Sequence, residues 1–293
     1  MKVVLKEIRV KQYTKNILVF AAPLFGGVIL DNIVLLHIML AFIAFSFIAS
    51  AVYVINDIMD VEKDRQHPTK CKRPIASGAI SMSSAIILAI ILLSVAIGIS
   101  LYLDVAYTGL LIFYLVMNIA YSIKLKHVVL FDVMIIALGF VLRAFSGVVV
   151  SGVEASNWFI LCVFMLSLFL ALAKRRAEMV LFLKDNGKQR KVLKEYSLEL
   201  LDQLLMVATA ISITSYSLFA LYEHDSNSVH GGETESLKML ATIPLVIYGM
   251  FRYLYLVHIR KQGGAPEEVL IHDRHILITC VLFISVIFVM RNV

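Results

Sequence analysis

Acidic residues gather at the end of a long apolar segment, in the stretch Asn56-Asp57-Ile58-Met59-Asp60-Val61-Glu62-Lys63-Asp64. With about 100° per residue on a helix, its asparagine and aspartates lie within one arc of about 100°, whereas Glu62 points to the opposite side. Carboxylates directed at one place supply the hard oxygen ligands that Mg²⁺ prefers and commonly shares with substrate phosphates. The spacing therefore predicts a magnesium site at Asp57, Asp60 and Asp64, with Asn56 beside a diphosphate substrate. The alternative is a solvated acidic helix end.

A basic run follows the aspartates directly, in His67-Pro68-Thr69-Lys70-Cys71-Lys72-Arg73-Pro74. Cations beside a carboxylate site favour phosphate binding, because they neutralise the charge that the phosphate brings with it. We expect Lys70 and Arg73 to bind the substrate and to stabilise a leaving pyrophosphate. This neighbour favours the metal site over the alternative.

The composition places these residues in a membrane protein. The chain is 60% hydrophobic and 16% charged, with a mean hydropathy of +0.87, which is outside the range of soluble globular domains. Apolar runs long enough to cross a bilayer lie near residues 17–34, 37–56, 80–101, 105–122, 130–150, 157–174, 203–222, 237–257 and 275–291. We therefore predict an all-α polytopic membrane protein: an amphipathic segment at 1–16, nine transmembrane helices within 17–291, and a single integral membrane domain over 1–293.

The distribution of basic residues predicts the orientation. With nine spans, nearly all of the 27 Lys and Arg residues lie on the side of the N-terminus, and acidic residues such as Asp104 and Glu154 lie on the other side. The positive-inside rule then predicts a cytoplasmic N-terminus and active site in the inner or plasma membrane. Nucleic acid is excluded as a partner, because the positive charge is divided among short loops without a binding motif.

Two further segments could contact substrate. Tyr121 and Lys126 lie in the cytoplasmic loop that precedes the fifth span, where the alternative is an ordinary basic anchor. Arg143 lies within the fifth span, where a charge costs several kcal/mol unless it meets a cavity or a partner. We expect Arg143 to bind a phosphate or ribose, and the alternative is a structural ion pair.

The sixth span ends in Lys174-Arg175-Arg176-Ala177-Glu178. On a helix, Lys174, Arg175 and Glu178 share one side and Arg176 points away. Two cations with an acid suit the binding of an anion in a fixed geometry, although the positive-inside rule alone explains the cations. Asp273 and Arg274 enter the ninth span at the same side of the membrane and are expected to complete the pocket wall.

At these residues the chain resembles the UbiA superfamily of intramembrane prenyltransferases. The resemblance rests on the predicted spans, the Asn-Asp-x-x-Asp-x-x-x-Asp motif at 56–64 and the sequence Arg73-Pro74-Ile75-Ala76-Ser77-Gly78. It implies a helical bundle with a cytoplasm-facing active-site cavity. In most of that superfamily, a second Asp-rich motif after the sixth span also holds Mg²⁺ and the diphosphate of a prenyl donor.

This chain has the basic run at 174–178 in place of the second motif. In this respect the chain is similar to the decaprenyl-phosphate phosphoribosyltransferase branch of the superfamily. Further likeness lies in Lys11-Gln12-Tyr13-Thr14-Lys15-Asn16, Leu125-Lys126-His127 and Pro266-Glu267-Glu268-Val269-Leu270, while Arg176 departs from the uncharged residue expected there. The resemblance implies phosphoribosyl diphosphate as donor, polyprenyl phosphate as acceptor, and Lys11, Lys15 and Asn16 among the binding residues.

The resulting hypothesis is a Mg²⁺-dependent phosphoribosyltransferase that forms polyprenyl-phosphoryl-5-phosphoribose and pyrophosphate for cell-envelope polysaccharide precursors. Asp57, Asp60, Asp64, Lys174 and Glu178 are its expected catalytic residues. One alternative is transfer of a prenyl group from its diphosphate to an aromatic or quinone precursor. Another is a transport or lipid-binding membrane protein, which the gathering of polar residues on one side disfavours.

Overall fold

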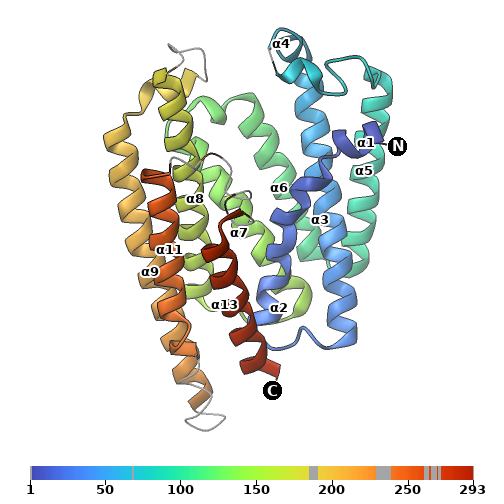
Figure 1. Cartoon of the computed structure of the whole chain (residues 1–293). Helices are drawn as coiled ribbons and strands as arrows, with labels where there is room; N and C mark the ends of the chain where they lie inside the picture. Colours follow the sequence, from blue (N-terminus) through green and yellow to red (C-terminus); the bar gives the residue numbers. More distant parts are fainter. Residues whose placement is uncertain are drawn as a thin grey trace. The chain divides into compact units, whose positions relative to one another are not determined.

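The computed structural model describes residues 2–67, 69–184, 191–228, 239–260, 264, 269 and 272–292, and every regular element within them is helical. The elements are α1 (Lys2–Glu7), η1 (Val10–Phe20), α2 (Ala21–Phe25), α3 (Asn32–Met59), α4 (Val61–Arg65), η2 (Lys70–Lys72), α5 (Met82–Leu103), α6 (Val105–Ile123), η3 (Leu125–His127), α7 (Phe131–Ser151), α8 (Asn157–Lys184), η4 (Lys191–Glu195), α9 (Leu198–Ser228), α11 (Ile243–His258) and α13 (Arg274–Asn292) (Figure 1). The prediction of an all-α protein is confirmed. The start of the predicted eighth span and most of the Pro266–Leu270 run lie outside the described residues.

The helices form two compact units. Unit 1 comprises Met1–Pro23, Val28–Lys124 and Leu142–Val153, and unit 2 comprises Leu24–Gly27, Leu125–Val141 and Glu154–Val293. Helix α7 therefore begins in unit 2 and ends in unit 1. A single domain over 1–293 stays a prediction.

Helix α3 is the centre of unit 1, where it packs against η1, α5 and α6. It begins at Asn32 because the side chain of Asp31 accepts hydrogen bonds from the backbone N–H groups of Ile33 and Val34 at 2.8 and 3.0 Å. The buried alanines of α3 let neighbouring helices approach closely. At one of them, the hydroxyl of Tyr107 donates to the carbonyl oxygen of Ala41 at 2.7 Å, which joins α6 to α3.

A second close approach joins η1 to the end of α7 within unit 1. A Cβ atom at Gly147 would overlap the carbonyl oxygen of Val19. Only a residue without a side chain lets the two backbones approach in this way. Gly147 therefore sets the distance between η1, which contains Asn16, and the half of α7 that contains Arg143.

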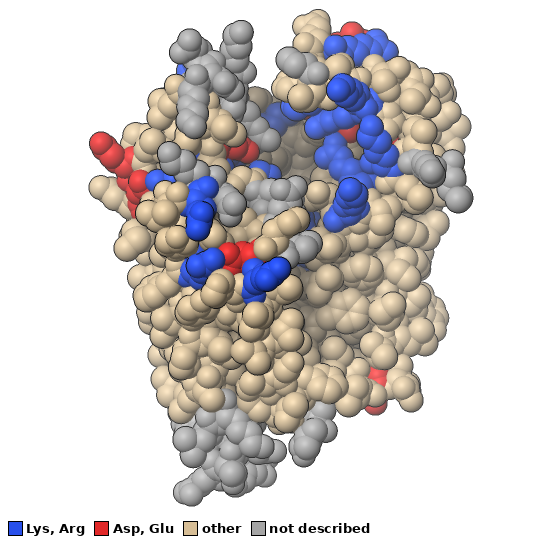
Figure 2. All heavy atoms as spheres, viewed as in Figure 1, with Lys and Arg blue, Asp and Glu red and all other residues tan. Residues whose placement is uncertain are grey.

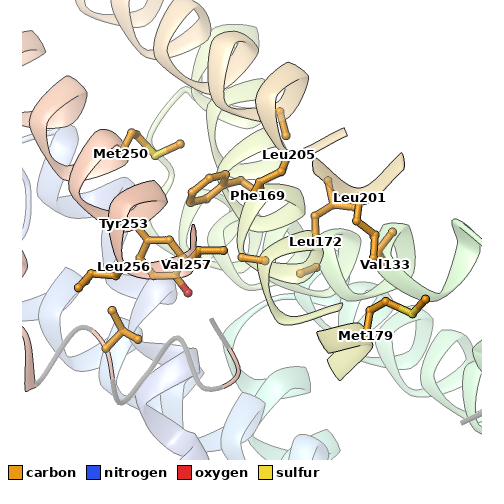
Figure 3. Close-up of a cluster of buried hydrophobic side chains, with 14 of the residues drawn as sticks. Val133, Phe169, Leu172, Met179, Leu201, Leu205, Met250, Tyr253, Leu256 and Val257 are labelled. Atoms are coloured by element: carbon orange, nitrogen blue, oxygen red, sulfur yellow. The ribbon is translucent and has the colours of Figure 1, made fainter. Parts of the chain in front are cut away.

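Unit 2 has its own apolar core between α8, α9 and α11, with the start of α7 at its edge (Figure 3). Phe169 of α8 and Tyr253 of α11 meet edge to face, with their ring centroids 5.3 Å apart. Leu201 and Leu205 of α9 are fully buried beside them. This packing supports the part of α8 that contains the basic run 174–178.

Six described helices are long and apolar enough to cross a membrane: α3, α5, α6, α7, α8 and α9. The apolar helices Ile243–His258 and Arg274–Met290 are shorter. The prediction of one helix over 17–34 is wrong, because α2 ends at Phe25, the chain turns through Gly27 with φ of 70°, and Asn32 already belongs to α3. Nine transmembrane helices remain a prediction.

Candidate active site

The acidic motif lies at a break between two helices. Helix α3 ends at Met59, and α4 begins at Val61, with Asp60 between them at φ −97° and ψ 6°. The prediction of one continuous helix through 56–64 is therefore wrong. Asp57 and Asp64 are buried, with side chains 3% and 4% exposed, whereas the Asp60 side chain is 21% exposed and lies 3.7 Å from the Lys63 ammonium.

One guanidinium bridges the two buried aspartates. Nη1 of Arg73 donates to Oδ1 of Asp57 at 2.9 Å and to Oδ2 of Asp64 at 2.6 Å. Nη2 of Arg9 donates to both oxygens of Asp57, at 2.7 and 2.8 Å. We call Arg9, Asp57, Asp64 and Arg73 the acidic cluster. In this cluster, two buried carboxylates accept hydrogen bonds from two guanidiniums.

Other cations surround this cluster. The ammonium of Lys70 lies 3.9 Å from Oδ1 of Asp64, and the ammonium of Lys6 donates to the carbonyl oxygen of Lys72 at 3.1 Å. Figure 2 shows Lys and Arg side chains gathered over the part of unit 1 where Figure 1 places α1 and α4. Such a concentration of positive charge attracts an anion and holds it near the carboxylates.

The donor chemistry fits a hard divalent cation at the Asp57–Asp64 pair. The two carboxylates share one nitrogen of Arg73, so their oxygens lie close enough together to bind one cation. Among the described residues, no group of three or more His, Cys, Asp or Glu side chains could hold a metal ion. A site with two protein carboxylates suits Mg²⁺ in particular, because Mg²⁺ usually completes its shell with water and substrate phosphates. Asp60 as a third ligand stays a prediction.

Glu7, at the end of α1, is the least expected member of this region. Its side chain is 1% exposed, and in the described part of the chain neither carboxyl oxygen has a hydrogen-bond partner. Burial, and next the negative charge of Asp57, raise the pKa of Glu7 to about 7 against the opposing effect of Arg9 and Arg73. Glu7 is therefore a buried carboxyl group without a hydrogen bond among the described residues, and the charges of the acidic cluster act on it.

A second polar network in unit 1 surrounds Arg143, which is buried. Its Nε donates to Oδ1 of Asn16 at 2.8 Å, and its Nη2 donates to the hydroxyl of Tyr114 at 2.9 Å. The guanidinium also lies over the rings of Phe45 and Tyr114, 5.0 Å from each centroid. Asn16 in turn donates to the hydroxyl of Ser46 at 2.9 Å. The structure thus brings two predicted binding residues, Asn16 and Arg143, into one hydrogen-bonded network.

The remaining predicted residues of unit 1 lie at its surface or half-buried. Lys11 is exposed on η1, and Lys15 is half-buried on the same element. Asn56 is half-buried one turn before the end of α3, and Tyr121 is half-buried near the end of α6. Glu62 is 75% exposed and pairs with Arg65 at 2.9 Å, which confirms that Glu62 points away from the site.

In unit 2, the basic run 174–178, which lies within α8, meets the start of α7. Arg175 is buried, and its Nη2 lies 2.8 Å from Oδ2 of the fully buried Asp132. Arg175 also pairs with Glu178, one helical turn later. The hydroxyl of Tyr196 donates to Oδ1 of Asp132 at 2.7 Å and accepts from the backbone N–H of Leu130 at 2.8 Å. Burial first, and then this bond to Asp132, raise the pKa of Tyr196.

This arrangement separates the roles within the basic run. Arg175 has its charge balanced by two carboxylates inside unit 2, whereas Lys174 is exposed. Arg176 pairs with Asp202 of α9, which also lies 3.3 Å from Nε2 of His258. The prediction that Arg176 points away from Lys174, Arg175 and Glu178 is consistent with this partner.

Asp273, which is predicted to form part of the pocket wall, pairs with Arg252 of α11. Asp273 accepts from Nη2 of Arg252 at 2.7 Å and from the backbone N–H of Ile276 at 3.0 Å. The bond to Arg252 is the first cause that lowers the pKa of Asp273. These contacts anchor α13 to α11 and cap its first turn. Arg274 is exposed beside it, and Lys126 is half-buried in η3.

Sequence analysis missed Arg9, Glu7 and Tyr196. Arg9 lies 48 residues from Asp57 in the chain, and Tyr196 lies 64 residues from Asp132. No local spacing pairs residues at such separations. The one available signal was the charge of Glu7 and Arg9 within a segment otherwise expected to lie at a membrane surface.

Comparison with known proteins supplies relatives over most of the chain. A sequence model described as the UbiA prenyltransferase family matches residues 17–189. A decaprenyl-phosphate phosphoribosyltransferase of Corynebacterium glutamicum is 34% identical over 274 residues, covering 92% of this chain and 81% of the relative. The protein of the same description from Mycobacterium tuberculosis is 33% identical over 288 residues, covering 97% and 92%.

Solved structures share the fold. A UbiA homolog from Archaeoglobus fulgidus, bound to GPP and Mg²⁺, has a TM-score of 0.74 at 21% identity and covers 99% of this chain and 100% of its own. A digeranylgeranylglyceryl phosphate synthase has a TM-score of 0.65 at 21% identity, covering 99% and 98%. At these identities the likeness concerns the fold.

Proposed function

Because the chain belongs to the UbiA prenyltransferase family, we propose that it transfers a 5-phosphoribosyl group from phosphoribosyl diphosphate to a polyprenyl phosphate such as decaprenyl phosphate. The products are polyprenyl-phosphoryl-5-phosphoribose and pyrophosphate. The observation that carries this proposal is the similarity, over nearly the whole chain, to proteins described as decaprenyl-phosphate phosphoribosyltransferases. The cation-rich acidic cluster supports it, since every substrate of this reaction is a phosphate.

The chemistry needs positioning and charge stabilisation more than a base. A phosphate oxygen of the acceptor attacks the anomeric carbon of the ribose with inversion, the bond from that carbon to the diphosphate breaks, and the electron pair leaves with pyrophosphate. The acceptor phosphate is already ionised near pH 7. Negative charge therefore develops on the leaving group, and preorganised cations there lower the barrier.

The acidic cluster has the parts for that task. Asp57 and Asp64 would hold Mg²⁺, which supplies a Lewis acid to the leaving diphosphate. Arg73 and Lys70 lie beside the same carboxylates, and they would donate to the pyrophosphate oxygens as charge develops. Because Arg73 bridges both aspartates, these buried carboxylates are paired with a positive charge.

Lys174 is the proposed anion contact of unit 2. Its buried neighbour Arg175 pairs with Asp132 and Glu178, so Arg175 and Glu178 would hold this part of α8 in place, and the exposed Lys174 would bind a phosphate. This assigns Glu178 a positioning role through Arg175. Replacement of a second Asp-rich motif by this basic run suits a reaction whose donor and acceptor both bring phosphates.

The helices place this reaction at a membrane. We propose a multi-pass protein of the plasma membrane with a cytoplasmic N-terminus, because nearly all Lys and Arg residues lie in segments that the positive-inside rule assigns to the cytoplasm. The polyprenyl tail of the acceptor would remain in the bilayer while its phosphate reaches the protein.

The test is direct transfer by the purified protein in detergent. The protein is incubated with Mg²⁺, decaprenyl phosphate and phosphoribosyl diphosphate labelled in the ribose, and label is measured in the organic phase. We expect transfer that depends on Mg²⁺ and on the lipid. Asp57→Asn serves as the inactive control, and Glu62→Gln, at an exposed acid, serves as the active one.

A specific observation supports one competing function. A solved relative of this fold is described as bound to GPP and Mg²⁺, so prenyl transfer to an aromatic acceptor is the alternative to test in parallel. Label entering an aromatic acid from a prenyl diphosphate, without phosphoribosyl transfer, would contradict the proposed donor and acceptor.

A further inference from the structure

A buried carboxylate without a hydrogen bond is rare, because burial of an unpaired charge costs several kcal/mol. Glu7 is in this position: its side chain is 1% exposed, and both oxygens lack partners in the described chain. The phosphate groups of the substrates proposed above are anions, so they cannot satisfy it. When Glu7 is ionised, a guanidinium is a partner of the opposite charge, and Arg9 and Arg73 act on it electrostatically.

The nearest supply of cations is the acidic cluster itself. Asp57 carries hydrogen bonds from two guanidiniums, with Arg9 Nη2 on both oxygens and Arg73 Nη1 on one of them. A divalent cation at Asp57 and Asp64 must displace at least one of these donors. Arg73 and Arg9 are only 27% exposed, so a displaced guanidinium needs a new anionic partner close by.

The backbone conformation of Arg9 indicates that Arg9, rather than Arg73, is the residue that moves. Arg9 joins α1 to η1 with φ of 53° and ψ of 49°, in the left-handed region that non-glycine residues seldom occupy. Such a conformation persists where surrounding contacts hold it, here the two bonds to Asp57 and the stacking of the guanidinium over Tyr53 at 4.6 Å. Glu7 lies two residues away at the end of α1.

We propose that Glu7 is a positioning residue that accepts the guanidinium of Arg9 when a divalent cation binds Asp57 and Asp64. This role rests on the proposed function and extends it to the N-terminal helix. Glu7 would then convert cation binding into a movement of Arg9 away from Asp57, and α1 would respond to the metal although it supplies no ligand.

Direct ligation by Glu7 fits the structure less well. Glu7, Asp57 and Asp64 are all described residues, and they do not form a group of three that could hold a metal ion. The charges of Arg9 and Arg73 act on Glu7, so the guanidiniums are within electrostatic reach. Movement of Arg9 from Asp57 to Glu7 therefore needs a smaller rearrangement than bringing Glu7, Asp57 and Asp64 together around one metal ion.

The test is a double-mutant cycle on cation binding, without substrate. Mn²⁺ is titrated into the purified full chain in detergent at pH 8, and free Mn²⁺ is followed by electron paramagnetic resonance. We expect Glu7→Gln to weaken Mn²⁺ binding about tenfold, the loss of one charge-assisted hydrogen bond. In an Arg9→Ala background we expect Glu7→Gln to have no effect, since the guanidinium that Glu7 would accept is then absent.

Controls separate this role from a structural one. Glu62→Gln, at an exposed acid on α4, should bind Mn²⁺ as the wild type does. Thermal unfolding midpoints are measured for every variant. If Glu7→Gln fails to fold, Glu7→Asp replaces it. We then expect a smaller loss of Mn²⁺ binding when Arg9 is present and no loss in Arg9→Ala. Equal weakening with and without Arg9, or unchanged Mn²⁺ binding in Glu7→Gln, would overturn the proposal.

Failure of the exchange is distinguishable from failure of the proposed function. If the wild type binds Mn²⁺ with the expected cycle but transfers no phosphoribose, the positioning role of Glu7 stands and the substrates are wrong. If transfer occurs and the cycle shows no coupling between Glu7 and Arg9, the function stands and the exchange is excluded.

Discussion

Asp57 on α3 and Asp64 on α4 both accept hydrogen bonds from Arg73, and Asp60 lies at the break between these two consecutive helices. Each carboxylate is buried, so its partner is costly to remove. The guanidinium of Arg73 bonds to both carboxylates and so holds their oxygens close together.

The first prediction at the residue scale concerns Asp64. Asp64→Asn removes one of the two charges that would hold Mg²⁺, and we expect the transfer rate to fall about 100-fold or more. Glu62→Gln, two residues away and exposed, should keep its rate within about twofold of the wild type. Initial rates at several Mg²⁺ concentrations, with unfolding midpoints as a check of folding, measure both. A normal Mg²⁺ dependence in Asp64→Asn would contradict the assignment.

The second residue-scale prediction concerns stability and pH at Glu7. The pKa of this carboxyl is about 7 in the folded chain against an ordinary value of 4.5. Between these values the folded state keeps a proton that the unfolded state has released, so stability falls as the pH rises and the full cost is present above pH 7. Glu7→Gln should therefore raise Tm by about 5 °C at pH 8 and change it little at pH 5. An equal change at both pH values would exclude a buried ionised Glu7.

At the scale of elements, two contacts position the polar residues. Gly147 lets α7 approach η1, which brings Arg143 to Asn16 within unit 1. In unit 2, the Asp132–Arg175 pair joins the start of α7 to α8. The first contact depends on the small size of Gly147, and the second depends on the opposite charges of Asp132 and Arg175.

Gly147→Ala tests the first contact. The added methyl group must displace the Val19 carbonyl, and we expect a loss of about 2 kcal/mol of stability, as for overpacking in a core. Gly109→Ala on α6 is the matched control, since nothing lies within 4 Å of its Cβ and alanine favours a helix. Thermal unfolding in detergent compares the two. A similar midpoint for both variants would show that η1 and α7 are not held at this distance.

Arg175→Met and Lys174→Met test the second contact. Loss of Arg175 leaves Asp132 buried without its cation, at an expected cost of about 3–5 kcal/mol. Asp132→Asn combined with Arg175→Met should recover part of this loss. Lys174→Met should leave the unfolding midpoint near that of the wild type and raise KM for one phosphate substrate. The reverse pattern, with a destabilising Lys174→Met, would contradict the separation of roles in the basic run.

At the scale of the whole molecule, apolar helices and basic loops together determine how the chain is placed in a membrane. Ser77 is exposed in the loop that follows the acidic motif, and Tyr102 is 75% exposed near the opposite end of α5. In a variant whose three native cysteines are replaced, Ser77→Cys should react with a membrane-impermeant maleimide only in inverted vesicles. Tyr102→Cys should react only in intact cells. Exchanged labelling would reverse the proposed orientation.

The sequence alone determined the class of the protein and the position of its main chemistry. Apolar runs must become helices in a bilayer, because no water is available there to satisfy an open backbone, and the Asp motif with its basic neighbours is contained in nineteen consecutive residues, 56–74. The helical class and the outward direction of Glu62 followed from these local patterns.

Only the tertiary structure decided which charges meet. The pairs Arg9–Asp57, Asn16–Arg143, Asp132–Tyr196 and Asp132–Arg175 join residues far apart in the chain, and no periodicity encodes them. The structure also showed that Asp60 interrupts a helix and that Arg175 is buried while Lys174 is exposed. The physical reason is that the free energy of a buried charge depends on what packs around it in space, which only the folded chain specifies.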